Sequence, residues 1–165
     1  MPEPIAPTLV TTIDSPIGPL TLMARDGRLT HLVMEDQTHA VEPPPGSRRD
    51  DDAFAEVILQ LDEYFAGERT AFDVPMTLEG TDFQRQVWVQ LCAIPYGETI
   101  SYGELARRVG NPNASRAVGS ANGRNPVAVI VPCHRVIATD GSLGGYGGGL
   151  DRKVRLLGIE QGRST

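Results

Sequence analysis

Short runs of apolar and β-branched residues, separated by polar turns, open the chain. Residues 8–15, 20–25 and 29–34 are three such runs, and each has the length of a β-strand. Asp26 and Gly27 separate the last two runs. An Asp-Gly pair readily adopts the positive φ angles of a tight hairpin turn. The pattern therefore predicts a β-hairpin preceded by a further strand.

A polar segment and then a helical pattern follow. Residues 42–52 contain three prolines, one glycine, two arginines and three consecutive aspartates, so a surface loop is expected. Apolar residues then recur at the spacing of an amphipathic helix that ends at Gly67. These residues are Phe54, Val57, Ile58, Leu61, Tyr64 and Phe65. Residues 1–78 are thus predicted to form a small α+β domain.

A second domain is predicted over residues 80–165, and its first residues carry the signal for the N-terminus of a helix. Thr81 followed by Gln84 has the spacing of a capping box, in which each side chain binds the other residue's backbone N–H. The helix should extend to Pro95. Its buried face is expected to contain Phe83, Val87 and Leu91, with Cys92 beside that face as a small buried hydrophobe.

Two shorter helices are expected next. Ser101 with Glu104 again suggests a capping box, and Gly110 ends this helix. A helix of small residues follows over residues 114–122, with Arg116 projecting from it. Two short helices joined by a tight turn resemble a helix-turn-helix, whose small residues would allow close approach to a DNA backbone. An ordinary helical pair in a compact domain explains the pattern as well.

The remaining apolar residues flank a glycine-rich loop. Residues 127–131 are all apolar, which indicates a buried strand. Residues 141–151 contain six glycines, which suits a mobile loop whose backbone comes close to a ligand. The spacing of a phosphate-binding loop is absent. A final helix is predicted to end near Glu160, with apolar positions at Leu150, Val154, Leu156, Leu157 and Ile159.

Composition and charge limit the function classes. The chain is 40% hydrophobic and 22% charged, which is typical of a globular protein. It shows no N-terminal signal and no apolar run near the ~20 residues of a membrane span, so a cytoplasmic location is expected. The net charge of −6 combines −10 in residues 1–80 with +4 in residues 81–165. This asymmetry fits a basic binding half, or simply two solvated surfaces of unequal charge.

The cysteines direct attention to one site. Cys92 and Cys133 are too few for a disulfide scaffold or a four-cysteine zinc site. A free cysteine has a pKa of about 8.5, and a neighbouring base or cation shifts it toward the nucleophilic thiolate. His134 and Arg135 directly follow Cys133 and supply both. Pro132 indicates irregular backbone there. A packed cysteine between polar residues is the simpler alternative for this pair alone.

Several motifs around Cys133 together resemble those of the O6-alkylguanine-DNA alkyltransferases, also called methylated-DNA–protein-cysteine methyltransferases. Residues 132–136 read Pro-Cys-His-Arg-Val, residues 125–127 Asn-Pro-Val, residues 116–119 Arg-Ala-Val-Gly and residues 156–160 Leu-Leu-Gly-Ile-Glu. The glycine-rich loop and the runs TDFQRQVW and IPYGETISYGELA extend the resemblance over residues 80–165. Residues 14–22 match the N-terminal domain of the family more loosely.

The resemblance implies a fold and a reaction. The expected fold is α+β, with a small ribonuclease-H-like N-terminal domain and a winged-helix-like C-terminal domain that contains the helix-turn-helix. The expected reaction is irreversible, stoichiometric transfer of an alkyl group from O6-alkylguanine in double-stranded DNA to Cys133, after the damaged nucleotide is flipped out. O4-alkylthymine is a further conceivable substrate. The resemblance implies a monomer that approaches DNA from the minor-groove side, without cofactor or metal.

The resemblance also implies roles for individual residues. Cys133 is the expected nucleophile, with His134 as its base through a water molecule and Glu160 orienting His134. Tyr102 would donate to N3 of the departing guanine, Asn125 would brace the strand, and Arg116 would enter the duplex. The expected DNA-binding residues are Arg116, Ser101, Ala117, Gly119, Ser120 and Arg124, and the expected pocket residues are Val136, Tyr146, Gly147 and Lys153. Many relatives have serine in place of Gly147.

Three other classes compete with this interpretation. An alkyltransferase-like lesion sensor would lack the nucleophilic cysteine, and Cys133 argues against it. A cysteine hydrolase that uses Cys133, His134 and Glu160 is disfavoured, because adjacent cysteine and histidine are poorly placed for direct proton transfer. A transcription regulator built on the helix-turn-helix would be favoured by a dimerisation segment or an effector domain, and the sequence shows neither.

Overall fold

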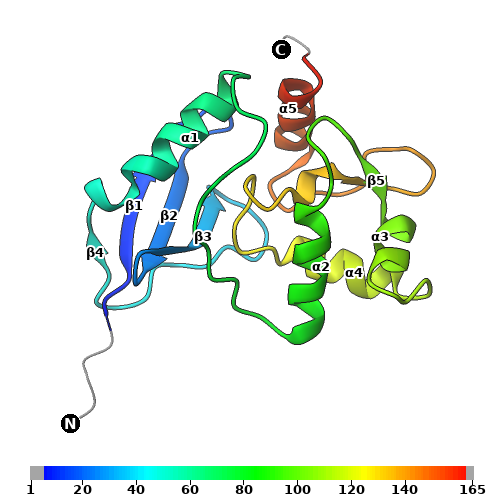
Figure 1. Ribbon diagram of the computed structural model, residues 1–165, viewed down its shortest axis with the longest axis horizontal. Coiled ribbons are helices and arrows are strands. Elements are labelled where there is room, and N and C mark those ends of the chain that lie inside the picture. The colour runs from blue at the N-terminus through cyan, green and yellow to red at the C-terminus, as the bar shows by residue number, and fades with distance from the viewer. Residues whose placement is uncertain (1–5, 163–165) are drawn as a thin grey trace.

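The chain folds into a sheet-containing half and a largely helical half that pack side by side (Figure 1). The computed structural model describes residues 6–162, so residues 1–5 and 163–165 of the two predicted domains lie outside the described residues. The predicted α+β architecture is confirmed. Within the described residues, the helices are too short or too polar to cross a membrane.

A four-stranded sheet forms the N-terminal half. Strands β1 (Leu9–Ile13), β2 (Leu20–Arg25) and β3 (Arg28–Met34) are antiparallel, and the predicted hairpin turn has positive φ at both Asp26 and Gly27. The loop prediction for residues 42–52 is wrong at one point. There β4 (Arg48–Arg49) pairs in parallel with β1, at the edge of the sheet. This pairing uses backbone groups only, so exposed polar side chains do not prevent it.

One helix covers this sheet. A 3₁₀ turn, η1 (Asp52–Phe54), leads into α1 (Ala55–Phe65), which lies across the strands in Figure 1. The helix buries Leu61 and Tyr64, and the predicted stop at Gly67 is realised with a φ of 76°. The spacing of apolar residues thus predicted both the extent and the buried face of α1.

As far as residue 162, the C-terminal half contains four α-helices, one 3₁₀ helix and a two-stranded parallel sheet. Its elements are α2 (Asp82–Cys92), β5 (Ile100–Ser101), α3 (Tyr102–Arg108), α4 (Ser115–Gly123), η2 (Cys133–Arg135), β6 (Val136–Ile137) and α5 (Leu150–Glu160). The capping box of Thr81 and Gln84 is complete. At Ser101 only half of the predicted box forms, because the Glu104 carboxylate accepts hydrogen bonds from two arginines of its own helix instead.

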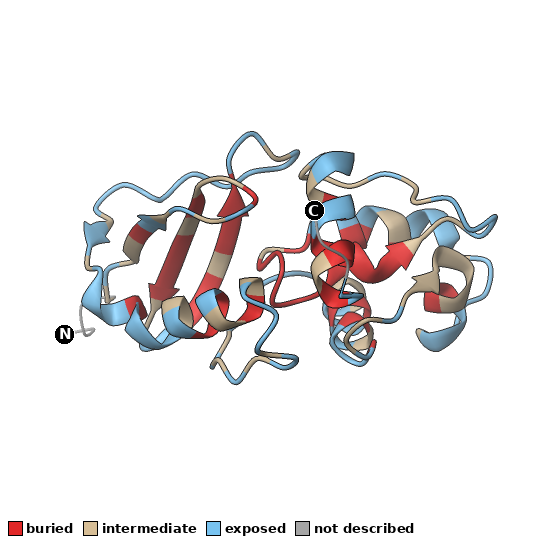
Figure 2. Ribbon diagram, turned by 90° about the horizontal axis from the view of Figure 1, so that it is seen from above, coloured by how far each residue is buried: buried red, intermediate tan, exposed pale blue. Residues whose placement is uncertain are grey.

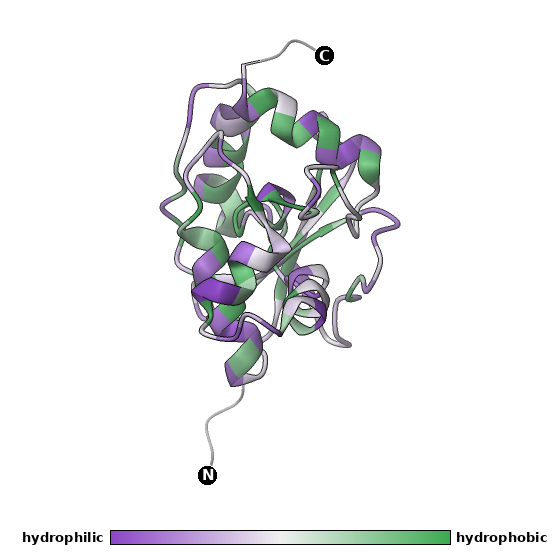
Figure 3. Cartoon of the chain, turned by 90° about the vertical axis from the view of Figure 1, so that its right-hand side faces the viewer, coloured by the Kyte–Doolittle hydropathy of each residue, from purple (hydrophilic) through white to green (hydrophobic). Residues whose placement is uncertain are grey.

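Some predicted buried faces are rotated in the structure. In α2 the core side chains are Val87, Trp88 and Leu91, and Phe83 is only half-buried. Cys92 is exposed, contrary to prediction, because one helical step turns it about 100° away from Leu91. In α5 the apolar Leu150 and Val154 are likewise exposed. Figure 3 shows the helices of this half with alternating hydrophobic and hydrophilic residues.

The segment of residues 127–131 is buried, but it is a turn and not the predicted strand. Val127 forms a single parallel bridge with Leu32 of β3, and the backbone then reverses through Val129, whose φ is 72°. An apolar run of this length indicates burial without distinguishing a strand from a buried turn. The segment lies between β3 and α2 (Figure 1), where Figure 2 shows buried chain joining the two halves.

Candidate active site

Cys133 is the first residue of a short 3₁₀ helix, η2, in which the side chains of Cys133, His134 and Arg135 point in different directions. Pro132 has φ −83° and ψ 64°, so the backbone is irregular there, as the sequence predicted. Residues in a 3₁₀ helix are about 120° apart. Cys133 therefore faces a cavity on one side of the turn, while Arg135 lines a separate hollow elsewhere. The side chains of Cys133, His134 and Arg135 are all buried.

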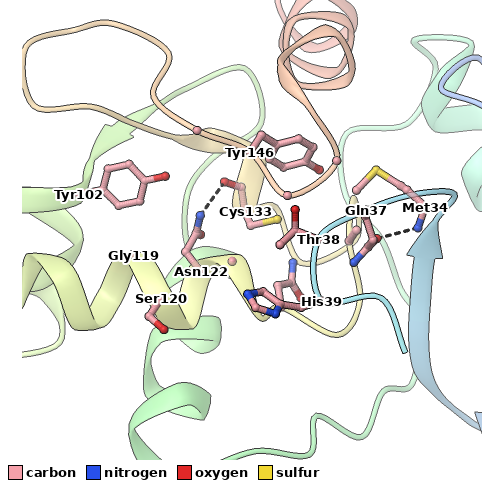
Figure 4. Close-up of a pocket in the computed structure, with 16 residues that line it drawn as sticks. Met34, Gln37, Thr38, His39, Tyr102, Gly119, Ser120, Asn122, Cys133 and Tyr146 are labelled. Carbon is pink, nitrogen blue, oxygen red and sulfur yellow. Dashed lines mark hydrogen bonds between the residues drawn. The ribbon is translucent and has the colours of Figure 1, made fainter. Parts of the chain in front are cut away.

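A cavity of about 330 Å³ opens in front of the Cys133 thiol (Figure 4). Tyr102 from α3, the start of the turn at Asn125, and Tyr146 from the glycine-rich loop all line it. The remaining lining residues of this half are Gly119, Ser120, Asn122, Gly123, Ala128, Gly145, Gly147 and Gly148. Of the residues that the resemblance implies for the pocket, Val136 and Lys153 do not line the cavity, and both are fully buried.

The N-terminal half completes the cavity wall. Met34, at the end of β3, and the following Gln37, Thr38 and His39 line the side opposite Tyr102 (Figure 4). These four residues were not among the predicted site residues. Nothing in their local pattern marks them, because they reach Cys133 only through the packing of one half on the other.

The glycine-rich loop is held from both halves. The buried Lys153 ammonium donates to the backbone oxygens of Val136 at 2.7 Å, Leu143 at 2.6 Å and Gly145 at 3.1 Å. From the N-terminal half, the Thr38 N–H donates to the Gly147 oxygen at 2.8 Å. Lys153 thus fixes the shape of the loop that carries Tyr146.

Two glycines of this loop differ in the space around them. A Cβ at Gly148 would lie 2.6 Å from the end of the Met34 side chain, so a side chain there requires Met34 to move. At Gly147 a Cβ would meet its nearest neighbour at 3.7 Å, which is ordinary contact. A small side chain such as serine would therefore fit here.

Asn125 closes the turn in front of Cys133. Its amide group donates to the Val131 oxygen at 2.7 Å, and its side-chain oxygen accepts from the Val127 N–H at 2.9 Å. These two hydrogen bonds join the ends of the turn that contains Val129 in its left-handed conformation. A β-branched residue is strained there, so the surrounding contacts must hold it.

Behind Cys133, a buried carboxylate gathers several donors. Glu160 lies 2.5 Å from Nε2 of His134 and 2.7 Å from Nε of Arg135. A second Arg135 nitrogen lies 3.1 Å from Oε2, and the Tyr64 hydroxyl donates to the same oxygen at 2.6 Å. The family resemblance implied the pairing of Glu160 with His134. It gave no indication that Arg135 and Tyr64 would join them.

Burial controls the protonation states at this site. It raises the pKa of the Cys133 thiol above its ordinary value, although Asn125, Tyr146 and the Lys153 charge act in the opposite direction. Burial also lowers the pKa of His134, against the effect of Glu160. For Glu160, burial opposes ionisation, but the hydrogen bonds from His134, Arg135 and Tyr64 prevail and lower its pKa to about 2. The resting site therefore holds a thiol, a neutral imidazole and a carboxylate.

Three buried polar atoms around Cys133 have no hydrogen-bond partner in the part of the chain that the structure describes: Nδ1 of His134, the Tyr146 hydroxyl and Oδ1 of Asn122. The Tyr146 hydroxyl lies near enough to Cys133 to affect its pKa, but its geometry is not that of a hydrogen bond. Unpaired buried groups are rare because each costs about 1–3 kcal/mol. Their clustering beside a cavity suits a site whose partners arrive with a ligand.

Helix α4 presents small and basic residues beside the cavity mouth. Arg116, Ala117 and Ser120 of this helix are exposed, as is Arg124 directly after it, while Val118 and Ala121 pack inward. Gly119 and Ser101 are half-buried, and Gly119 lies against the Tyr102 ring. Helices α3 and α4 pack on each other as the predicted pair. Within residues 6–162, His, Cys, Asp and Glu side chains do not gather in threes as a metal site requires.

Two family models match the chain. The ribonuclease-like domain of 6-O-methylguanine DNA methyltransferase matches residues 8–78, and the DNA-binding domain of the same family matches residues 82–162.

Individual relatives agree with these matches. The methylated-DNA–protein-cysteine methyltransferase of Mycolicibacterium paratuberculosis is 57% identical over 154 residues, which are 93% of this chain and 92% of the relative. The protein of the same name from Methanosarcina acetivorans is 50% identical over 147 residues, covering 89% of this chain and 94% of the relative. A crystal structure of Mycobacterium tuberculosis OGT in complex with DNA superposes with a TM-score of 0.91, at 54% identity and 94% coverage of both chains.

Proposed function

The chain belongs to the O6-methylguanine DNA methyltransferase family, and from this premise we propose that Cys133 is the residue that accepts the alkyl group. The protein repairs DNA by transferring an alkyl group to a cysteine of its own chain. One observation carries the assignment to Cys133. Its thiol faces a cavity beside α4, whereas the exposed Cys92 lies on α2, outside the residues that line this cavity.

The charged cluster behind Cys133 supports a route for the thiol proton. Because Nε2 of His134 lies against the Glu160 carboxylate, it carries the imidazole proton, and Nδ1 is the nitrogen free to accept another. We propose that Nδ1 takes the thiol proton through a water molecule. The imidazolium that forms is then stabilised by Glu160. A base is needed here because burial keeps Cys133 protonated at neutral pH.

The transfer itself is a displacement at the alkyl carbon. The sulfur–carbon bond forms as the bond between carbon and O6 breaks, and the electron pair leaves with the guanine. Tyr102 lines the cavity, and burial raises the pKa of its hydroxyl, so it is a proton donor at neutral pH. We propose that it donates to N3 of the leaving guanine. The His134 imidazolium then gives its proton through solvent to the Tyr102 phenolate. The guanine, the tyrosine and the imidazole are all neutral at the end.

The product explains why the reaction stops after one round. A thioether at Cys133 offers no easy route back to a thiol, unlike a thioester or a disulfide. Each molecule therefore repairs one lesion. Larger alkyl groups must fit between Tyr146 and the wall formed by Met34 and Thr38. O4-alkylthymine would need to present its alkyl carbon to the same thiol.

Recognition of the lesion requires the nucleotide to leave the stack, since Cys133 is buried in the protein. We propose that α4 enters the minor groove, where its small residues allow close approach, and that Arg116 fills the space left by the flipped guanine. Ser101, Ala117, Gly119, Ser120 and Arg124 would contact the DNA backbone nearby. The protein is proposed to act as a monomer in the cytoplasm. Residues 1–78 and 80–165 are proposed as its two domains.

Intact-mass measurement tests the assignment. After incubation with duplex DNA that contains O6-methylguanine, wild-type protein and Cys92→Ala should each gain one methyl group in place of one hydrogen. Cys133→Ser should gain none, and peptide mapping should place the label on Cys133. More than one methyl group per molecule, or a label on Cys92, would contradict the proposal.

A further inference from the structure

Tyr64 connects the N-terminal half to the charged cluster behind Cys133. It lies on α1, is only 1% exposed, and donates its hydroxyl hydrogen to Oε2 of Glu160 at 2.6 Å. The two residues are 96 positions apart in the chain. The proposed transfer uses Glu160 and His134 and assigns no role to this hydroxyl. We therefore ask what a buried phenol does when it donates to a carboxylate that takes part in the proton transfer.

Oε2 of Glu160 is shared among three donors. Besides the Tyr64 hydroxyl, Nε2 of His134 lies at 2.5 Å and Nη2 of Arg135 at 3.1 Å. An ionised carboxylate has about four acceptor positions over its two oxygens, so three donors on one oxygen compete for its charge. Each donor reduces the negative charge that the other two experience. Tyr64 thereby acts on His134 without touching it.

The Tyr64 hydroxyl is a donor throughout the working pH range. Burial and the neighbouring Glu160 carboxylate raise its pKa far above the ordinary value for tyrosine, so it does not ionise. Its hydrogen therefore always points to Glu160. The contact is a fixed dipole whose positive end faces the carboxylate that His134 also contacts.

We propose that Tyr64 is a positioning residue for alkyl transfer, which holds the Glu160 carboxylate against His134 and limits the negative charge that the imidazole experiences. His134 then stays neutral and can accept the thiol proton. The inference rests on the proposed roles of Cys133 and His134. It makes the N-terminal half a direct participant in the chemistry of the other half, through one hydroxyl group.

Other charged and titratable groups face the same pair, and Tyr64→Phe leaves all of them in place. Arg135 contacts Glu160 from η2, and the Tyr96 ring lies near both from the loop after α2. The Lys153 ammonium on α5 acts on His134 from a greater distance. The positive charges of Arg135 and Lys153 both lower the pKa of His134, because they repel its protonated imidazole. The variant therefore isolates the effect of one hydroxyl dipole.

The test compares Tyr64→Phe with wild type, with Tyr96→Phe as the matched control. Tyr96 belongs to the same aromatic cluster, but its hydroxyl donates to the Ile159 backbone at 3.4 Å and not to Glu160. The measured quantity is the rate of Cys133 alkylation by free O6-benzylguanine from about pH 5 to about pH 9. The free base removes DNA binding and nucleotide flipping from the measurement.

Loss of the hydroxyl leaves more negative charge on Glu160, which stabilises the imidazolium of His134. The pKa of His134 should therefore rise, and the acid limb of the rate profile should move to higher pH by about one unit. At a given pH on the acid limb, the variant should react about tenfold more slowly than wild type. On the alkaline plateau its rate should stay within about threefold of wild type. Tyr96→Phe should reproduce the wild-type profile.

Equal slowing at every pH would mean that Tyr64 serves only the fold, and would overturn the inference. An NMR titration of the His134 imidazole in unreacted protein provides a second reading that does not depend on rates. A raised imidazole pKa in Tyr64→Phe supports the inference, and an unchanged one overturns it. A wild-type protein that takes no methyl group on Cys133 from O6-methylguanine in DNA would instead refute the proposed function, and the inference with it.

Discussion

Replacing Glu160 by glutamine should destabilise the protein substantially, because its carboxylate neutralises a buried cation. The Glu160 side chain is fully buried, and the Arg135 guanidinium that contacts it is 9% exposed. In Glu160→Gln the arginine charge stays buried without its counter-ion. One carboxylate oxygen also becomes an N–H₂ group, which faces donors from Tyr64, His134 or Arg135. Breaking a buried ion pair in this way typically costs about 3–5 kcal/mol.

The pKa of Glu160 gives an independent figure of similar size. Its fall from the ordinary 4.5 to about 2 corresponds to about 3 kcal/mol of stability at neutral pH, at ~1.4 kcal/mol for each pKa unit. Since the folded-state pKa is depressed, this stability is present above about pH 4.5 and is lost as the pH falls toward about 2. At about pH 3.5 the gap between wild type and variant should be about 1 kcal/mol smaller than at neutral pH.

Urea denaturation at both pH values measures the gap. Glu104→Gln is the matched control, because Glu104 also contacts two arginines but lies at the surface, and its loss should have a much smaller effect. A variant within about 1 kcal/mol of wild type at neutral pH would refute the account of Glu160 as the counter-ion of a buried arginine. A gap that does not narrow in acid would show that its ionisation does not contribute to stability.

Two further predictions concern the pocket loop and the DNA surface. Lys153→Met should leave the buried Val136 oxygen and the part-buried oxygens of Leu143 and Gly145 without their donor. It should lower the free energy of unfolding by about 2–4 kcal/mol and slow the reaction with free O6-benzylguanine; unchanged denaturation and rate would exclude its role in holding the loop. Arg116→Ala should leave the reaction with the free base almost unchanged but slow the reaction with duplex DNA, about tenfold for each ~1.4 kcal/mol of flipping energy lost, and the reaction with single strands less. Equal losses on all three substrates would mean that Arg116 supports the fold and not the flipped state.

The local sequence determined most of the secondary structure. Asp26 and Gly27 specify their turn because few residue pairs tolerate two consecutive positive φ angles. Thr81 and Gln84 specify the start of α2 because each satisfies a backbone group three residues away. The motifs spread over residues 80–165 together indicated the chemistry and the family, whereas the residues next to Cys133 alone did not.

The sequence did not determine features for which two local conformations fit the same residue pattern equally well. The apolar residues 127–131 could form either a buried strand or a buried turn, and the turn forms because Asn125 joins its two ends while Leu32 pairs with one of them. The exposure of Cys92 depended on which face of α2 meets α4. The spacing of apolar residues along α2 does not decide whether the buried face is shifted by one residue.

Only the tertiary structure decided which distant residues surround Cys133. Met34 and Thr38 form one wall of the cavity, and Tyr64 reaches Glu160 across 96 positions of the chain. In the sequence, Met34 and Tyr64 are ordinary core residues of a strand and a helix. Their positions at the site follow from how the sheet half packs against the helical half. That packing sums many weak apolar contacts, so short motifs carry no record of which side chains it brings together.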